Sequence, residues 1–226
     1  MSLVVAQQLD ICKDSNQLLS FIGKCMQAPN KYLPADERRA VTVEAVIELA
    51  AQQNPSEIST AAIAKHMGVT QGSLFRHFTN KEAILESVMN WVAQRLLARI
   101  DKAMHAQTTA TASLRAAFMT HIQFISEHPG VPRLLFSELQ RKENTAAKKL
   151  VNVLLSQYQQ RLQQTLEHGK HKQEFAADLD VKAAALLFIG SIQGLVVQSI
   201  VQGDSDTLLQ AAQDTFLLYL RAIEAR

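Results

Sequence analysis

The chain has 226 residues, of which 47% are hydrophobic and 19% are charged, and its formal net charge is +2. This composition excludes an intrinsically disordered chain, and eight glycines with five prolines are too few turn residues for a β-rich fold. We therefore predict an all-α protein of two domains, because one domain takes roughly 100 to 200 residues.

The only two cysteines, Cys12 and Cys25, lie near the start of the chain, so the sequence carries no disulfide framework and no paired Cys-x-x-Cys metal motif. No apolar run reaches the ~18 to 20 residues of a membrane span, and the first residues lack the basic segment of a signal peptide. We expect a cytoplasmic protein that does not contact a membrane.

Residues 1–33 form an N-terminal extension that is less polar than a disordered tail. Its apolar residues recur at helical spacing, namely Leu18, Leu19, Phe21, Ile22, Cys25 and Met26. We predict an extra helix here, packed on the neighbouring domain or on a partner subunit.

The next predicted helix begins near Pro34 and stops before Asn54-Pro55. Asp36 and Glu37 lie in its first turn, where acidic groups interact favourably with the helix dipole. Its inward-facing residues are Val43, Val46, Ile47 and Ala50.

Two short helices separated by a tight turn are predicted between Ile58 and Glu82. Ser59 or Thr60 can cap the first helix, and Gly68 supplies the permissive backbone that ends it. Such a pair of helices is typical of a DNA-binding helix-turn-helix.

The second of these helices has an inward and an outward side. Thr70 can cap it, and Leu74 and Phe78 stand four residues apart and face inward. The outward or flanking residues are Gln71, Gly72, Ser73, Phe75, Arg76 and His77. With a net charge of only +2, any DNA affinity must come from local groups of this kind.

Two outward side chains are candidates for reading DNA bases. Glutamine can pair with adenine and arginine with guanine in the major groove, which suits Gln71 and Arg76. Gly72 allows the backbone to approach the groove, whereas a merely solvated helix face is the alternative. The candidates for phosphate contacts are Ser59, Thr60, Thr70, Ser73, His77 and Lys81.

The run from Gly68 to Phe75, followed by His77-Phe78 and Lys81-Glu82, resembles the TetR/AcrR family of dimeric bacterial transcriptional repressors. The motif-level similarity covers roughly Pro34 to Val88. The sequence departs from the family pattern at two places. The family usually has a tyrosine where this chain has Phe75, and a Gly-containing loop where this chain has Asn54-Pro55-Ser56-Glu57.

The resemblance implies a helix-turn-helix domain at 34–80 and a C-terminal effector-binding and dimerisation domain at 81–226. It also implies a homodimer that binds a palindromic site in double-stranded DNA and a small apolar ligand. No cofactor is expected, and neither a catalytic site nor a metal site emerges from the residues, since His168 and His171 lack further ligands nearby.

The segment Thr79-Asn80-Lys81-Glu82 is a candidate capping box for a long helix that reaches about Met104. Because this helix crosses the presumed domain boundary, a tilt at its far end must move the recognition helix. Four further helices follow from about Leu114 to His128, from Pro132, from about Thr145 to Gly169 and from about Leu179 to Gln202. A last helix is predicted from Asp204 to Glu224.

An effector pocket is implied by the resemblance, and aromatic residues scattered over the C-terminal helices are candidates to line it. More often such residues simply form the core. The candidate pocket residues are Phe118, His121, Phe124 and Tyr158, of which the polar ones are expected to orient a ligand.

The last two helices are predicted to form the dimer interface. One apolar seam runs along the first of them through Ala183, Leu187, Gly190, Gly194, Val197 and Val201. Two glycines on one helical stripe suggest close approach of another helix, in a second subunit or within the same chain. The expected companion face on the final helix comprises Leu208, Ala212, Thr215, Leu218 and Tyr219.

These features favour a repressor that a small, largely apolar effector releases from its operator. The alternative is a DNA-bound adaptor whose C-terminal domain binds a protein partner. A sizeable closed cavity would favour the effector, and a filled core with a long exposed apolar groove would favour the adaptor.

Overall fold

A computed structural model describes residues 34–202 and 207–225, and within these ranges the chain forms helices and no strands. The predicted all-α class is confirmed. The helix expected in residues 1–33 and the start of the last helix at Asp204 lie outside the described residues.

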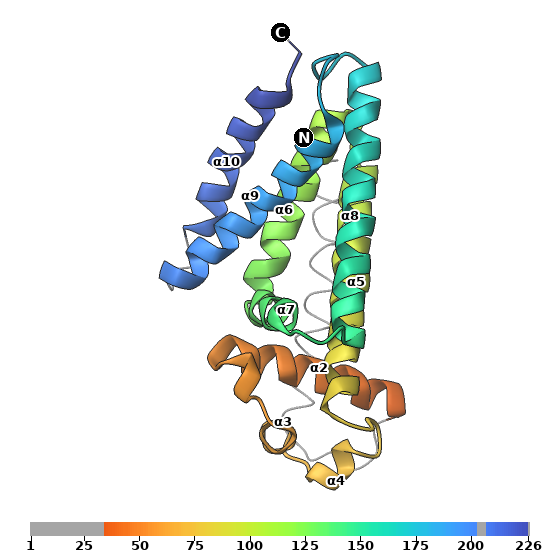
Figure 1. Cartoon of the computed structure of the whole chain (residues 1–226), viewed down its shortest axis with the longest axis vertical. Coiled ribbons are helices and arrows are strands. Elements are labelled where there is room, and N and C mark those ends of the chain that lie inside the picture. The colour runs from red at the N-terminus through yellow and green to blue at the C-terminus, as the bar shows by residue number, and fades with distance from the viewer. Residues whose placement is uncertain (1–33, 203–206, 226) are drawn as a thin grey trace, which may run out of the picture.

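The structure has a small unit at one end and a bundle of longer helices stacked on it (Figure 1). The small unit comprises α2 (Ala35–Gln52), the 3₁₀ turn η1 (Pro55–Glu57), α3 (Thr60–His66) and α4 (Gln71–Leu74). The bundle comprises α5 (Lys81–His105), α6 (Ala110–Glu127), α7 (Gly130–Gln140), α8 (Ala146–His171), α9 (Val181–Gln202) and α10 (Leu208–Ile223).

Helix α5 links the small unit to the bundle without interruption. Its first turn is capped by the Asn80 side chain, which accepts a hydrogen bond from the Ala83 amide at 2.8 Å, and not by the expected box that starts at Thr79. Asn80 takes this place because its extended backbone aims the side chain at the free amides of the first turn. The buried face of α5 includes Ile84, Val88, Val92, Leu96 and Ile100, so the helix is held in one core along most of its length.

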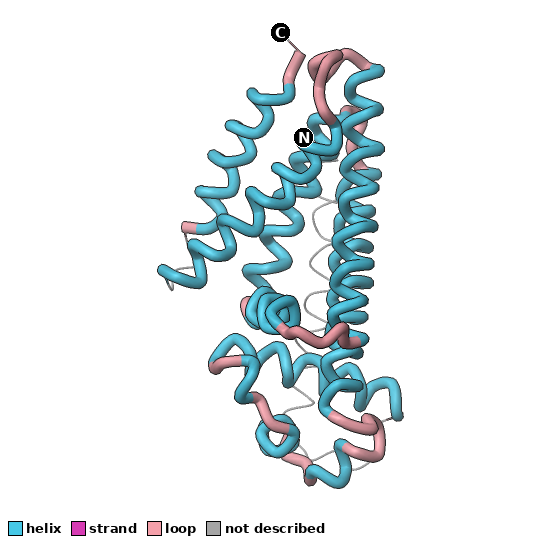
Figure 2. The backbone as a smooth tube through the Cα atoms, viewed as in Figure 1, coloured by secondary structure: helices cyan, strands magenta, loops and turns pink. Residues whose placement is uncertain are grey.

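Helix α7 lies between the long helices and α2 (Figure 2). The sequence predicted that this helix begins at Pro132, but it begins at Gly130. Gly130 packs so closely on α2 that a Cβ atom there would overlap the Ile47 carbonyl oxygen and lie 2.9 Å from the Ala51 amide nitrogen. The backbones of the two units therefore touch at this point.

Helix α9 begins at Val181, because the Asp180 side chain accepts hydrogen bonds from the amides of Lys182 and Ala183 at 2.9 and 3.1 Å. Among the described residues, it alone is long and apolar enough to cross a membrane, with a mean hydropathy of 1.9 over 18 residues. The expectation that no segment reaches this length is wrong. Polar residues such as Ser191 and Gln193 interrupt the run but do not lower its average enough.

Candidate nucleic-acid interface

The first helix of the predicted helix-turn-helix is α3. Its cap is Ser59, whose hydroxyl accepts a hydrogen bond from the Ala62 amide at 3.1 Å. Ile63 and Ala64 are buried against the neighbouring helices, and the chain leaves α3 through Gly68, whose φ of 65° favours glycine. These local features confirm the predicted start and end of this helix.

The second helix, α4, is shorter than its pattern predicted. Thr70 caps it by accepting a hydrogen bond from the Ser73 amide at 3.2 Å, and the helix ends at Leu74, one turn later. A tighter turn follows, in which the His77 and Phe78 amides both donate to the Leu74 carbonyl oxygen. Leu74 and Phe78 are buried as predicted, so packing of these two side chains holds the turn in place.

The ten predicted DNA contacts all keep some accessible surface in the free protein. Ser59, Thr70, Gln71, Gly72, Phe75 and Arg76 are exposed, and Thr60, Ser73, His77 and Lys81 are half-buried. They come from α3, α4, the start of α5 and the residues that flank these helices, at the end of the molecule away from the chain's C-terminus (Figure 1). The structure thus brings them to one end, while their contacts with DNA stay a prediction.

The chemistry of this end suits a duplex. In the part of the chain that the structure describes, Arg76 and Lys81 make no ion pair, so both charges are available to a ligand. The Gln71 side chain donates to the Thr60 hydroxyl at 2.6 Å, which ties the start of α4 to α3. Phe75 is 44% exposed on the same turn and offers an apolar ring without a hydroxyl.

An apolar cavity of about 70 Å³ lies inside the bundle, between α5, α6, α7, α8 and α9. His121, Phe124 and Tyr158 line it, as predicted. Phe118 does not, because it packs edge to face on Phe188 at 5.1 Å and belongs to the core. Leu135 and Phe136 of α7 also line the cavity, and no motif in the sequence marks them for this role.

Two polar atoms at this cavity, His121 Nδ1 and Tyr158 Oη, are buried without a hydrogen-bond partner among the described residues. Burial lowers the pKa of His121 to about 4, so the imidazole is neutral at pH 7. Burial also raises the pKa of Tyr158 far above its usual value, so its hydroxyl stays protonated.

The buried imidazole predicts a pH-dependent stability. The unfolded chain binds a proton at His121 near pH 6.5 but the folded chain only near pH 4, so protons favour unfolding and the free energy of unfolding falls as the pH drops between these values. The loss should stay below about 3 kcal/mol, because residue 121 as a whole keeps some accessible surface.

Urea unfolding at a series of pH values measures this effect. His121→Leu should flatten the slope without abolishing it, because burial also lowers the pKa of His128. An unchanged slope in His121→Leu would show that another group is responsible.

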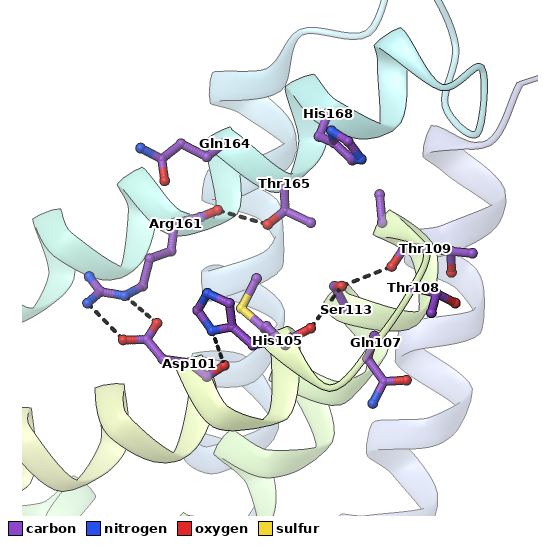
Figure 3. Close-up of a pocket in the computed structure, with 12 residues that line it drawn as sticks. Asp101, His105, Gln107, Thr108, Thr109, Ser113, Arg161, Gln164, Thr165 and His168 are labelled. Atoms are coloured by element: carbon purple, nitrogen blue, oxygen red, sulfur yellow. Dashed lines mark hydrogen bonds and ion pairs between the residues drawn. The ribbon is translucent and has the colours of Figure 1, made fainter.

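A polar cleft of about 360 Å³ opens at the far end of the bundle, where α5, α6 and α8 meet (Figure 3). Arg161 holds Asp101 through two hydrogen bonds of 2.7 and 3.0 Å, and the Ser113 hydroxyl donates to the Thr109 carbonyl oxygen at 2.9 Å. These groups therefore already satisfy one another, and nothing in the cleft singles out a ligand. In the residues described, no cluster of three or more potential metal ligands occurs.

The predicted dimer seam on α9 is accessible. Leu187 is 52% exposed and Val197 44%, and a Cβ atom added at Gly190 or Gly194 would meet no described atom within 4 Å apart from the adjoining backbone of α9 itself. The glycines therefore do not mark close packing inside one chain, which was the alternative explanation of the seam.

The companion face on α10 is only partly as predicted. Leu218 is 66% exposed, but Leu208, Ala212 and Tyr219 are buried in the same chain. Tyr219 also donates to the Ala184 carbonyl oxygen at 3.2 Å, which joins α10 to α9. The large exposed apolar residues of α10 are Leu209, Leu217 and Leu218, so its outward face is rotated relative to the prediction.

Comparisons with known proteins agree with this geometry. A model of the bacterial regulatory proteins of the tetR family matches residues 43–88, and a model of the tetracyclin repressor-like C-terminal domain matches residues 107–197. The nucleoid occlusion factor SlmA of Vibrio cholerae is 27% identical over 188 residues, which cover 82% of this chain and 94% of that protein. The SlmA of Vibrio atlanticus is 25% identical over 158 residues, which cover 70% of this chain and 81% of that protein.

Two solved structures share the fold. The fatty acid degradation regulator FadR from Bacillus halodurans has a TM-score of 0.74 at 22% identity, over 87% of this chain and all of that one. The regulator FadR from Bacillus subtilis in complex with stearoyl-CoA has a TM-score of 0.71 at 22% identity, over 82% of this chain and 99% of that one. The helix-turn-helix and the bundle are thus arranged as in known regulators.

Proposed function

Since this chain belongs to the TetR family of DNA-binding regulators, we propose that it is a cytoplasmic, homodimeric repressor of a palindromic operator, released by a small, largely apolar effector. The observation that carries the proposal is that α5 and α7 each connect the apolar cavity to the helix-turn-helix unit. Both helices line the apolar cavity, and both contact the small unit that carries α3 and α4.

Operator reading is assigned to the exposed turn at α4. Gln71 and Arg76 supply the hydrogen-bonding groups that pair with adenine and guanine edges in the major groove. Thr70 and Lys81 would hold the duplex through its phosphates, which positions the protein without reading sequence.

Release is assigned to displacement of α7 and α5. A ligand that widens the cavity must move some of its walls, and Leu135 and Phe136 place α7 among them. Because Gly130 of α7 touches the α2 backbone at Ile47, α7 cannot shift without moving α2. The effector then favours a state in which the two recognition turns no longer match the operator.

Alanine substitutions at the turn test the DNA-binding roles. Gln71→Ala and Arg76→Ala should each cost roughly 1 to 3 kcal/mol on the specific site and change binding to random DNA little. Lys81→Ala should weaken both alike and lower the slope of affinity against salt by about one charge. Fluorescence anisotropy across a salt series measures all three.

The control is Gln160→Ala, an exposed substitution on α8 that should change neither affinity nor slope. Equal weakening of specific and random DNA by Gln71→Ala would refute the reading role. An unaltered salt slope in Lys81→Ala would refute the phosphate role.

A second candidate function is that of a DNA-bound factor of nucleoid occlusion. It is favoured by the likeness to SlmA over 94% of that protein's length and by the cavity of only about 70 Å³, which is small beside ordinary ligand sites of ~300 to 1,000 Å³. Mapping the sites bound on the host chromosome separates the two. One or a few promoters support the repressor, and many sites spread over the chromosome support the occlusion factor.

A further inference from the structure

Two residues that line the cavity carry buried polar atoms, and these restrict the chemistry of its ligand. Tyr158 is 1% exposed, and its hydroxyl finds no partner among the described residues. His121 Nδ1 is in the same state, and the two rings lie 5.4 Å apart between centroids. Since buried polar atoms in proteins are nearly always hydrogen-bonded, this pair points to a ligand atom that completes both.

The remaining walls argue against a charged ligand. Among the described residues that line the cavity, none is Lys, Arg, Asp or Glu, and the one other polar side chain is Gln193, which is exposed on α9. A carboxylate or phosphate buried here would lack a counter-charge and would lose its hydration.

The two polar groups differ in what they offer. The Tyr158 hydroxyl stays protonated, since burial raises its pKa, so it can donate to an oxygen. The neutral His121 ring can accept at Nδ1 or donate there, according to its tautomer. A ligand hydroxyl can accept from Tyr158 and donate to His121, and a carbonyl oxygen can accept from both.

We propose that this cavity binds an uncharged molecule with an apolar body and one hydroxyl or carbonyl oxygen, hydrogen-bonded to Tyr158 and His121. This inference rests on the effector site of the proposed function and names its ligand class. A cavity of about 150 Å³ holds benzene in another protein, so the present 70 Å³ accepts a ring only if a wall such as α7 moves.

The experiment compares phenol, benzene and benzoate on the full-length protein, because they share one ring and differ in a hydroxyl and a charge. Binding is followed by ligand titration of the ring proton signals of His121 in NMR spectra. Phenol should bind most tightly, benzene more weakly and benzoate not measurably. Tyr158→Phe should weaken phenol binding roughly 2- to 10-fold, leave benzene unchanged and leave the fold intact.

A merely structural role for Tyr158 would change stability without changing the order of ligands, so the preference for phenol over benzene is the decisive readout. If Tyr158→Phe fails to fold, His121→Leu gives the same comparison, with binding followed by the shift in thermal midpoint. Benzoate binding as tightly as phenol, an unchanged preference in the variants, or no binding of any probe would overturn the inference.

Operator release is measured separately, by anisotropy with labelled DNA. Selective phenol binding without release would refute the effector role and leave the ligand class standing. Release by a charged ligand with no preference for phenol would refute the ligand class alone.

Discussion

Gly194→Arg is expected to give a folded monomer that binds a palindromic operator roughly 100-fold or more weakly than the wild type, because the second half-site contact is lost. Apart from the adjoining backbone of α9 itself, no described atom lies within 4 Å of a Cβ atom at this position, so the start of the new side chain has room in its own chain. It would instead place a long charged group in the seam that Leu187 and Val197 expose.

Light scattering coupled to size exclusion gives the mass, and circular dichroism gives the helix content. Gln160→Arg, which adds the same charge on the exposed surface of α8, should remain a dimer with normal affinity. A Gly194→Arg protein that stays dimeric and binds its operator normally would place the interface elsewhere.

Gly130→Ala is expected to lower the free energy of unfolding by more than about 3 kcal/mol. The added methyl group would overlap the Ile47 carbonyl oxygen, and backbone atoms of a packed helix cannot move aside as a flexible side chain does. The substitution should therefore separate α7 from α2 or unfold the small unit.

Gly72→Ala is the matched control. The nearest atom to a Cβ there is the Thr70 hydroxyl oxygen at 4.0 Å, so stability should stay the same or rise by up to about 1 kcal/mol. Its expected defect is in DNA binding, because the groove approaches this backbone. Urea unfolding of both variants checks the pair, and a Gly130→Ala protein with the wild-type midpoint would refute the close contact.

The sequence predicted best those structural features that depend on residues close together in the chain. Ser59 and Thr70 each place a hydroxyl next to the free amides of a first helical turn, and both accept the expected hydrogen bond. Burial of Leu74 and Phe78 followed from their spacing. The fold class, the helix-turn-helix and the family were therefore predictable from short segments.

The features that the sequence did not predict depend on contacts between distant segments. Phe118 and Phe124 have the same side chain on one helix, yet only Phe124 reaches the cavity, because Phe118 meets Phe188 and Phe216. Likewise, Tyr219 turns inward because its hydroxyl bonds to α9. Apolar spacing shows that a helix has a face, but not whether that face meets its own chain or another.

The membrane-length apolar run of α9 shows the same limit. Only 33% of its most apolar 18-residue stretch is buried inside the chain, so much of its apolar surface is left to contact another molecule. The proposed dimer supplies one, and it explains why a DNA-binding protein carries such a helix.

The most direct test of the dimeric, operator-reading account is selection of binding sites from random DNA by the full-length protein, followed by footprinting. We predict enrichment of a two-fold symmetric sequence that two protomers protect, with half-site centres about 34 to 36 Å apart or slightly more. Gln71→Ala should lose that preference at specific base pairs. Enrichment of no sequence, or protection of a single half-site by one protomer, would contradict the account.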